Sequence, residues 1–148
     1  MLIMLKLLEI RVYNMKKIIG ECHCKKVQWS LTLPVTTVVQ CHCDNCRKMQ
    51  GSDYSTWIAA PDKQFVIESG NELISTYEFN ERSCKSFCSS CGSVVYGING
   101  KHFSGHKLVA LGSVEEYLKE LKPQIQVYTE NKAEWLQIHE EVPVFTKK

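Results

Sequence analysis

The segment Cys41-His42-Cys43-Asp44-Asn45-Cys46 places three cysteines within six residues, and a further cysteine motif lies on either side of it in the chain. The earlier motif is Cys22-His23-Cys24. The later motif is Cys88-Ser89-Ser90-Cys91, followed directly by Gly92. The eighth cysteine, Cys84, stands four residues before the later motif. This clustering indicates that the fold is built around the sulfur atoms of the chain.

Clustered cysteines form disulfides in oxidising compartments and hold metal in reducing ones, so the compartment decides between the two. Lys6, Glu9 and Arg11 interrupt the apolar N-terminal stretch, and no small-residue cleavage site follows it, unlike in a signal peptide. No run approaches the roughly 20 apolar residues that cross a bilayer. We therefore expect a cytoplasmic protein without membrane association, whose cysteines bind metal.

The first and third motifs together supply four thiolates for one closed site. Residues i and i+2 of a strand point to the same face, so Cys22 and Cys24 can serve one ion. A C-x-x-C turn brings Cys88 and Cys91 together, and the following glycine relieves the backbone. Structural zinc takes four such ligands in a tetrahedron. The simplest arrangement pairs the two motifs in a structural zinc site.

The middle motif then supplies three thiolates, from Cys41, Cys43 and Cys46. Three protein ligands and one open position distinguish catalytic from structural zinc. We therefore expect a second zinc here, with catalytic ligands and partial occupancy, giving two zinc ions per chain. Arg47 and Lys48 follow directly and are our candidates for contacts with an anionic substrate. We interpret the remaining Cys84 as a free thiol.

Alternating apolar residues and punctuating glycines predict a run of short strands. We expect strand-like segments at 27–33, 38–43, 54–59, 65–68, 73–79, 93–98 and 108–111. One late helix is predicted from Ser113, whose capping box with Glu116 marks its start, to Pro123, which ends it. The chain thus reads as an N-terminal extension, 1–17, and one mainly β domain, 18–148.

The composition argues against a nucleic-acid binder. The 148 residues carry 18 Lys and Arg against 16 Asp and Glu, a formal net charge of +2. The sequence pI is about 8.1, and the lysines are dispersed rather than gathered in a basic stripe. A partner of small size fits these charges better than DNA or RNA.

The three motifs, in this order and spacing, resemble the glutathione-dependent formaldehyde-activating enzyme family, also called the GFA or CENP-V domain. The resemblance rests on Gly-Glu-Cys-His-Cys at 20–24, Cys-His-Cys-Asp-Asn-Cys-Arg-Lys at 41–48 and Phe-Cys-Ser-Ser-Cys-Gly-Ser at 87–93, and it runs from about Ile18 to Phe145. It implies a β-tent fold with one four-cysteine zinc and one three-cysteine zinc, at which glutathione and formaldehyde meet. Gln126 stands where many members have a histidine.

The leading functional hypothesis is a zinc-dependent carbon–sulfur lyase resembling S-(hydroxymethyl)glutathione synthase. It would join or release formaldehyde and glutathione, or a similar small thiol. Zinc can lower the pKa of an incoming thiol or polarise the aldehyde oxygen. The alternative is a zinc-bound binding module without catalysis, whose partner is chromatin, nucleic acid or a protein.

Overall fold

The computed structural model describes residues 16–138 and 141–146. The described part holds eleven strands and one α-helix, with short 3-10 turns between them. The strands are β1 (Lys17–Glu21), β2 (Gln28–Thr32), β3 (Thr37–Cys41), β4 (Ser55–Pro61), β5 (Phe65–Ser69), β6 (Ile74–Asn80), β7 (Ser83–Cys88), β8 (Val94–Asn99), β9 (His106–Ala110), β10 (Ile125–Val127) and β11 (Val144–Phe145), and the helix is α2 (Asp44–Gln50). This mainly β architecture is the one predicted from the sequence.

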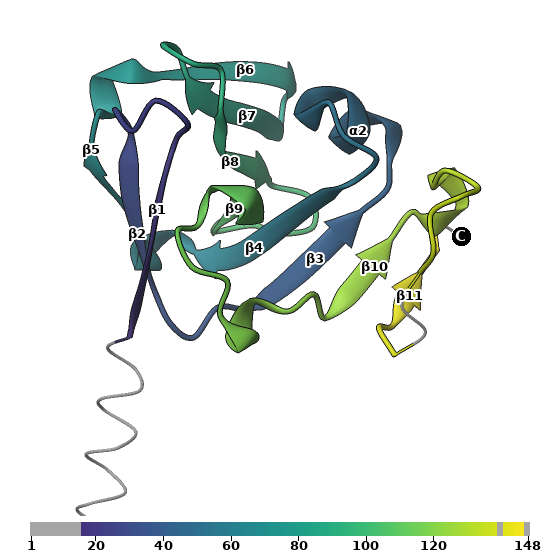
Figure 1. The fold of residues 1–148 in the computed structure, drawn as a ribbon. Coiled ribbons are helices and arrows are strands. Elements are labelled where there is room, and N and C mark those ends of the chain that lie inside the picture. Colours follow the sequence, from purple (N-terminus) through teal and green to yellow (C-terminus); the bar gives the residue numbers. More distant parts are fainter. Residues whose placement is uncertain (1–15, 139–140, 147–148) are drawn as a thin grey trace, which may run out of the picture.

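The strands form two sheets that lean against each other (Figure 1). The smaller sheet has the order β1-β2-β5, and the larger has the order β11-β10-β3-β4-β9-β8-β7-β6. All pairings are antiparallel except those of β10, which runs parallel to β3 on one side and to β11 on the other. Because both sheets have open edges, they make a tent rather than a closed barrel.

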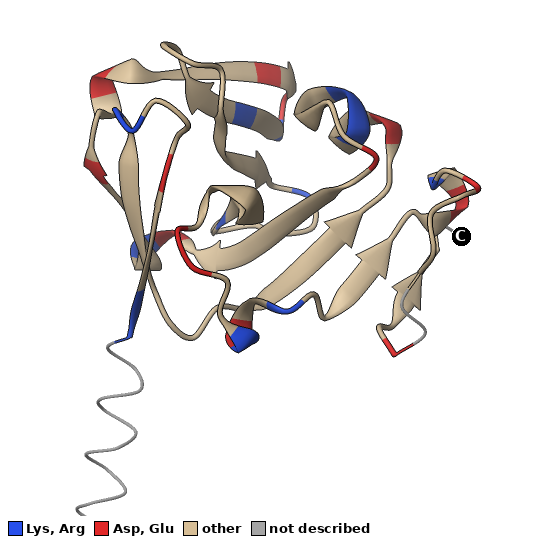
Figure 2. Ribbon diagram, in the orientation of Figure 1, with Lys and Arg blue, Asp and Glu red and all other residues tan. Residues whose placement is uncertain are grey.

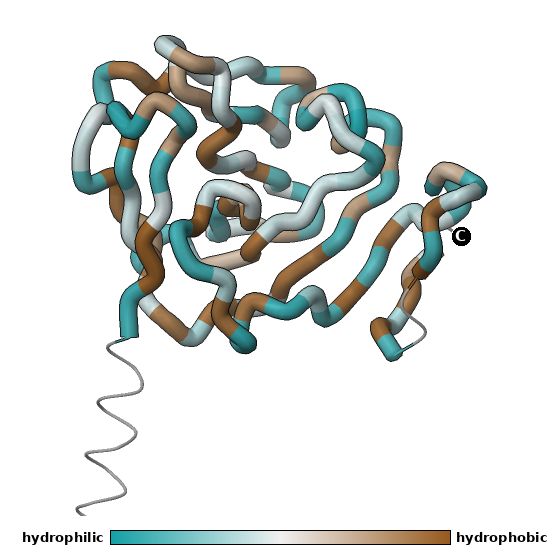
Figure 3. The backbone as a smooth tube through the Cα atoms, in the orientation of Figure 1, coloured by the Kyte–Doolittle hydropathy of each residue, from teal (hydrophilic) through white to brown (hydrophobic). Residues whose placement is uncertain are grey.

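The main core lies between the two sheets. Trp29 and Leu31 alternate along β2 and are both fully buried, as the spacing of apolar residues in that stretch predicts. Trp29 packs against the ring of Phe65 at 5.6 Å between centroids. From the larger sheet, Ile58 and Val109 meet them without any exposure. Figure 3 shows apolar segments on the strands and also in some of the connections between them.

The predicted late helix is wrong, because the segment 113–123 contains no α-helix. The chain there makes two 3-10 turns, Leu111–Ser113 and Lys119–Leu121. Ser113 donates its hydroxyl back to Ala110 O at 2.7 Å, so it does not cap a helix. Leu121 is buried while Tyr117 is 71% exposed, so the apolar residues are used singly rather than as one helical face.

Most of the predicted N-terminal extension, 1–17, lies outside the described residues. Lys17 belongs to the fold, since it is the first residue of β1 and pairs with Thr32 of β2. Within the part of the chain that the structure describes, no helix has the length and apolar character needed to cross a bilayer.

Candidate metal centres

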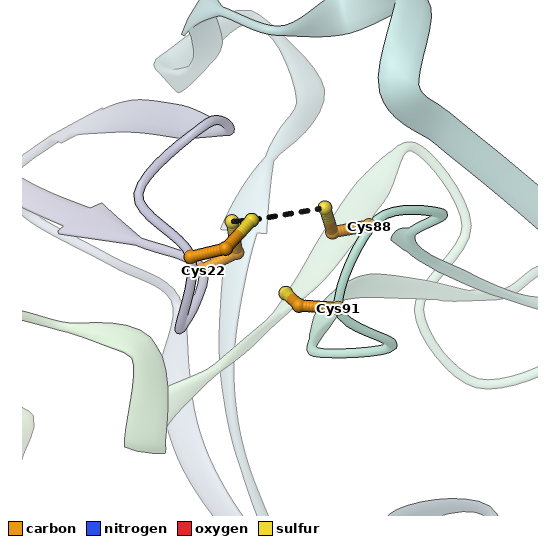
Figure 4. A group of neighbouring side chains, drawn as sticks. Cys22, Cys88 and Cys91 are labelled. Carbon is orange, nitrogen blue, oxygen red and sulfur yellow. Dashed lines mark hydrogen bonds between the residues drawn. The ribbon is translucent and has the colours of Figure 1, made fainter.

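Cys22, Cys24, Cys88 and Cys91 come together although the two motifs are more than sixty residues apart. Their four sulfur atoms all lie within 4.8 Å of one another. The Sγ atoms of Cys22 and Cys24 are 3.5 Å apart, and those of Cys24 and Cys88 are 3.9 Å apart. Figure 4 shows the side chains from the two turns pointing toward a common centre. This is the grouping predicted from the motif spacing.

Two tight turns produce this convergence. Cys22 and Cys24 lie in the turn after β1 rather than on a strand, which corrects the expectation that the C-x-C pair uses strand geometry. In the other turn, Gly92 has φ +77°, and its N–H donates to Cys88 O at 2.7 Å. His23 N donates to Ser93 Oγ at 3.0 Å and so links the two turns directly.

The donor set fits zinc. Four cysteine sulfurs in a compact group are the ligands of a closed structural site. Cys22 and Cys88 are buried, while Cys24 and Cys91 are half-buried at the surface of the group. An ion held by these residues would tie β1 to the β7–β8 hairpin.

Cys41, Cys43 and Cys46 form the second group, and their three sulfur atoms also lie within 4.8 Å of one another. Cys41 ends β3, Cys43 is the N-cap of α2, and Cys46 lies in the first turn of that helix. The predicted strand-like segment 38–43 is therefore too long at its end, because Cys41 belongs to β3 but Cys43 does not. Cys41 is buried, whereas Cys43 and Cys46 are half-buried, the same division that the four-cysteine group shows. The second group differs from the first in having three sulfur atoms rather than four.

Hydrogen bonds within the second group shift the pKa values of its thiols in opposite directions. The thiols of Cys41 and Cys46 donate to Cys43, and this lowers the pKa of Cys43 far below its usual value. The N–H of Cys46 adds a further hydrogen bond to Cys43 Sγ at 3.4 Å. The same interaction with Cys43, together with burial, raises the pKa of Cys41. The thiolate is therefore favoured at the start of the helix.

Three neighbours of this group were not identified from the sequence as site residues. Tyr128 packs against the small apolar cluster that contains Cys41. The pKa of its phenol is raised, mainly by burial and secondly by the nearby cysteines. The indole of Trp57 hydrogen-bonds with Cys46. His42 is buried, and its ring lies 5.3 Å from that of Tyr54. Of the three, only His42 lies within the cysteine motif, and the sequence carries no signal for Trp57 or Tyr128.

His42 also lies close to Gln126, the position at which many members of the similar family have a histidine. Gln126 is 2% exposed and lies close to the His42 ring, whose pKa is lowered by burial. The backbone follows the same path, since His42 N donates to Val127 O at 3.1 Å. The end of β10 is therefore hydrogen-bonded to the segment that carries Cys41 and Cys43.

Arg47 and Lys48, the predicted substrate contacts, both lie on α2 directly after the cysteines. Arg47 Nη2 bonds to Asp44 Oδ1 at 2.5 Å, so its charge is already paired within the helix. Lys48 is exposed. A third cation, Lys85 of β7, reaches the other end of α2 and donates to Met49 O at 2.7 Å. Figure 2 shows these positive residues near α2, with the remaining charges spread over the molecule.

One cavity of about 1150 Å³ opens between the helix side of the large sheet and the first cysteine turn. Its walls include Gln40, Tyr54 and Tyr117, with carboxylates from Glu21 and Glu115. None of the seven clustered cysteines except Cys22 lines it. The cavity is therefore a neighbour of the three-cysteine group rather than its entrance.

Cys84 belongs to neither group of sulfur atoms found among the described residues. It lies half-buried on β7, between Glu78 of β6 and Ile98 of β8, and burial raises the pKa of its thiol. This position agrees with its interpretation as a free thiol.

Comparisons with known proteins agree with this arrangement. A family model described as "Glutathione-dependent formaldehyde-activating enzyme" matches residues 17–131, which include all three cysteine motifs. No curated protein matches the sequence significantly. A crystal structure of a Rhodobacter sphaeroides protein is similar in fold, with a TM-score of 0.57 and 20% identity, covering 68% of this chain and 91% of its own.

Proposed function

The chain belongs to the glutathione-dependent formaldehyde-activating enzyme family, and on that premise we propose that it is a zinc-dependent carbon–sulfur lyase. It would join or release formaldehyde and glutathione, or a similar small thiol, in the cytoplasm. The observation that carries the proposal is the convergence of Cys41, Cys43 and Cys46 in a group of three sulfur atoms, separate from the group of four that Cys22, Cys24, Cys88 and Cys91 form.

The two groups divide the work. Four sulfurs leave no vacant position on a tetrahedral ion, so Cys22, Cys24, Cys88 and Cys91 hold a structural metal. Three sulfurs leave one position for a reactant, so Cys41, Cys43 and Cys46 are the ligands of the catalytic metal. Cysteine ligands bind zinc as thiolates, so binding of the ion would release the protons of these three residues.

A zinc ion in the open group would lower the pKa of the incoming thiol or polarise the aldehyde oxygen. The residues of the chain position the reactants. Lys48 projects from α2 into solvent and can attract a carboxylate of glutathione. Arg47 would do so only by exchanging its contact with Asp44, so we assign it the secondary role. The apolar surface of Trp57 behind Cys46 limits water on the inner side.

The test is a comparison of the zinc-loaded wild type with Cys43→Ser. Exchange between free glutathione and its hydroxymethyl adduct is followed by two-dimensional NMR at equilibrium, where catalysis appears as a faster exchange rate. We expect acceleration by the wild type and none by Cys43→Ser, since the variant loses one ligand of the open group.

Cys84→Ser is the matched control, because it removes a thiol that lies in neither group. It should accelerate exchange as well as the wild type does. Equal rates with wild type, Cys43→Ser and buffer would refute the lyase and leave the binding module as the better description of the chain.

A further inference from the structure

Tyr128 has a backbone conformation that its side chain disfavours. Its φ and ψ are 55° and 39°, in the left-handed region, where an aromatic residue is an outlier. Such a conformation costs on the order of 1–3 kcal/mol and persists only when the surroundings enforce it. Outliers of this kind cluster at functional sites, so the position of the side chain is informative.

Hydrogen bonds on both sides enforce the conformation. Tyr128 N donates to Phe145 O of β11 at 3.1 Å, and Tyr128 O accepts from Asn131 N at 3.0 Å. The preceding residue, Val127, pairs with Cys41 in the parallel register of β10 and β3. The chain therefore turns sharply one residue after it passes the first cysteine of the open group.

The turn directs the phenol to that group. Tyr128 packs against the cluster of Cys41, Trp57 and three small or apolar neighbours, to which Cys43 and Cys46 also contribute. It is the one tyrosine among the described residues whose ring packs in this cluster. An extended residue at 128 would instead continue along β10, away from the sulfurs. Tyr128 as a whole residue is half-buried.

We propose that Tyr128 is a catalytic residue that donates a hydrogen bond to the oxygen of the aldehyde as the carbon–sulfur bond forms. The sulfur electron pair forms the new bond to carbon, and the C=O π pair moves to oxygen. The oxygen takes a proton from water, and the proton of the thiol is released to water, so the addition needs no oxidant or reductant. In the reverse direction the same hydroxyl stabilises the departing aldehyde. This inference rests on the proposed lyase function.

A donor placed at a developing negative oxygen contributes to the rate, because its hydrogen bond strengthens as the charge forms. Tyr128→Phe removes only this hydroxyl and keeps both the ring and the backbone strain. We expect zinc content and melting temperature to be unchanged and kcat for adduct exchange to fall by about 10- to 100-fold with little change in KM. Tyr77→Phe, on an exposed residue of β6, should behave as the wild type.

A second measurement does not depend on turnover. In protein labelled with ¹³C at tyrosine Cζ, the Tyr128 resonance, assigned by its loss in Tyr128→Phe, should shift when formaldehyde and glutathione are added. The Tyr77 resonance should stay in place.

The outcomes separate the two proposals. A wild type that accelerates exchange together with a fully active Tyr128→Phe overturns the role of Tyr128 alone, as does an unmoved Tyr128 resonance. Loss of zinc from Tyr128→Phe also overturns it, because the tyrosine would then act on the metal group rather than on the reactant. A wild type without any acceleration removes both proposals.

Discussion

At the scale of single residues, Gly20 and Gly112 differ in whether the structure has room for a side chain. A Cβ at Gly20 would overlap the Trp29 ring and the carbonyl oxygen of Ser113, whereas a Cβ at Gly112 would meet nothing. We expect Gly20→Ala to lower the free energy of unfolding by about 2–3 kcal/mol, because Trp29 is fully buried and cannot move aside. Gly112→Ala should change it by less than about 0.5 kcal/mol. Urea titration of both variants tests this, and equal midpoints would contradict it.

Replacing a cysteine should affect the stability of the domain differently in the two groups. Cys22→Ser removes a buried ligand of the closed group, so we expect the domain to unfold or to lose well over about 10 °C in melting temperature. Cys43→Ser should leave the domain folded, since its group lies within residues 41–46 and does not join distant parts of the chain. Thermal melts followed by circular dichroism measure the difference. Similar losses in both variants would show that the groups do not differ in structural weight.

Residue identity was enough to predict which cysteines meet, because ligand chemistry restricts how eight thiols can be shared between two ions. It was not enough to find Tyr128. Tyrosine has no preference for the left-handed region, and the conformation comes from hydrogen bonds to Phe145 and Asn131 that form only in the folded chain. The closeness of His42 to Gln126 also had no signal in the sequence, because it depends on the pairing of β10 with β3.

At the scale of elements, α2 is short and is stabilised mainly at its ends. Cys43 caps its start and Gly51, with φ +63°, ends it. Lys85 also donates to Met49 O while its side chain lies over the Phe87 ring. Lys85→Met keeps the apolar contact and removes the donor, so the free energy of unfolding should fall by about 1 kcal/mol. Chemical denaturation against the exposed control Lys63→Met measures it, and identical curves would contradict the capping role.

The same helix explains where prediction from the sequence failed. Seven residues are too few for a hydrophobic period, and a cysteine N-cap is not among the common capping residues, so α2 gave no signal. Ser113 and Glu116 gave a strong signal without forming a helix, since Leu118 and Leu121 pack individually against the core. The strands were easier to predict, because the apolar residues of segments such as β2 and β4 follow a pattern that is visible in the sequence.

At the scale of the whole molecule, the C-terminal strand supports the open cysteine group through β10. Gln126 N donates to Pro143 O at 2.9 Å, and Val142 is buried. Removal of residues 142–148 should therefore lower stability by about 2–4 kcal/mol and weaken metal retention at Cys41, Cys43 and Cys46 before retention at the other group. Guanidinium unfolding and metal release to a chelator report the two effects. A truncated protein with wild-type stability would show that β11 is dispensable.

The order of strands could not be derived from the sequence, although most strands could. β10 and β11 lie far along the chain from β3, and their parallel pairings depend on contacts that no local pattern encodes. The family match ends at residue 131, before β11.

Zinc per folded chain, measured by inductively coupled plasma mass spectrometry on protein purified without chelators, tests the two-centre account most directly. We predict between one and two zinc ions in the wild type and in Cys84→Ser, because the second site is expected to be partly filled, and one in Cys43→Ser. One zinc in the wild type that Cys43→Ser leaves unchanged would contradict the account, because the three-cysteine group would then hold no metal.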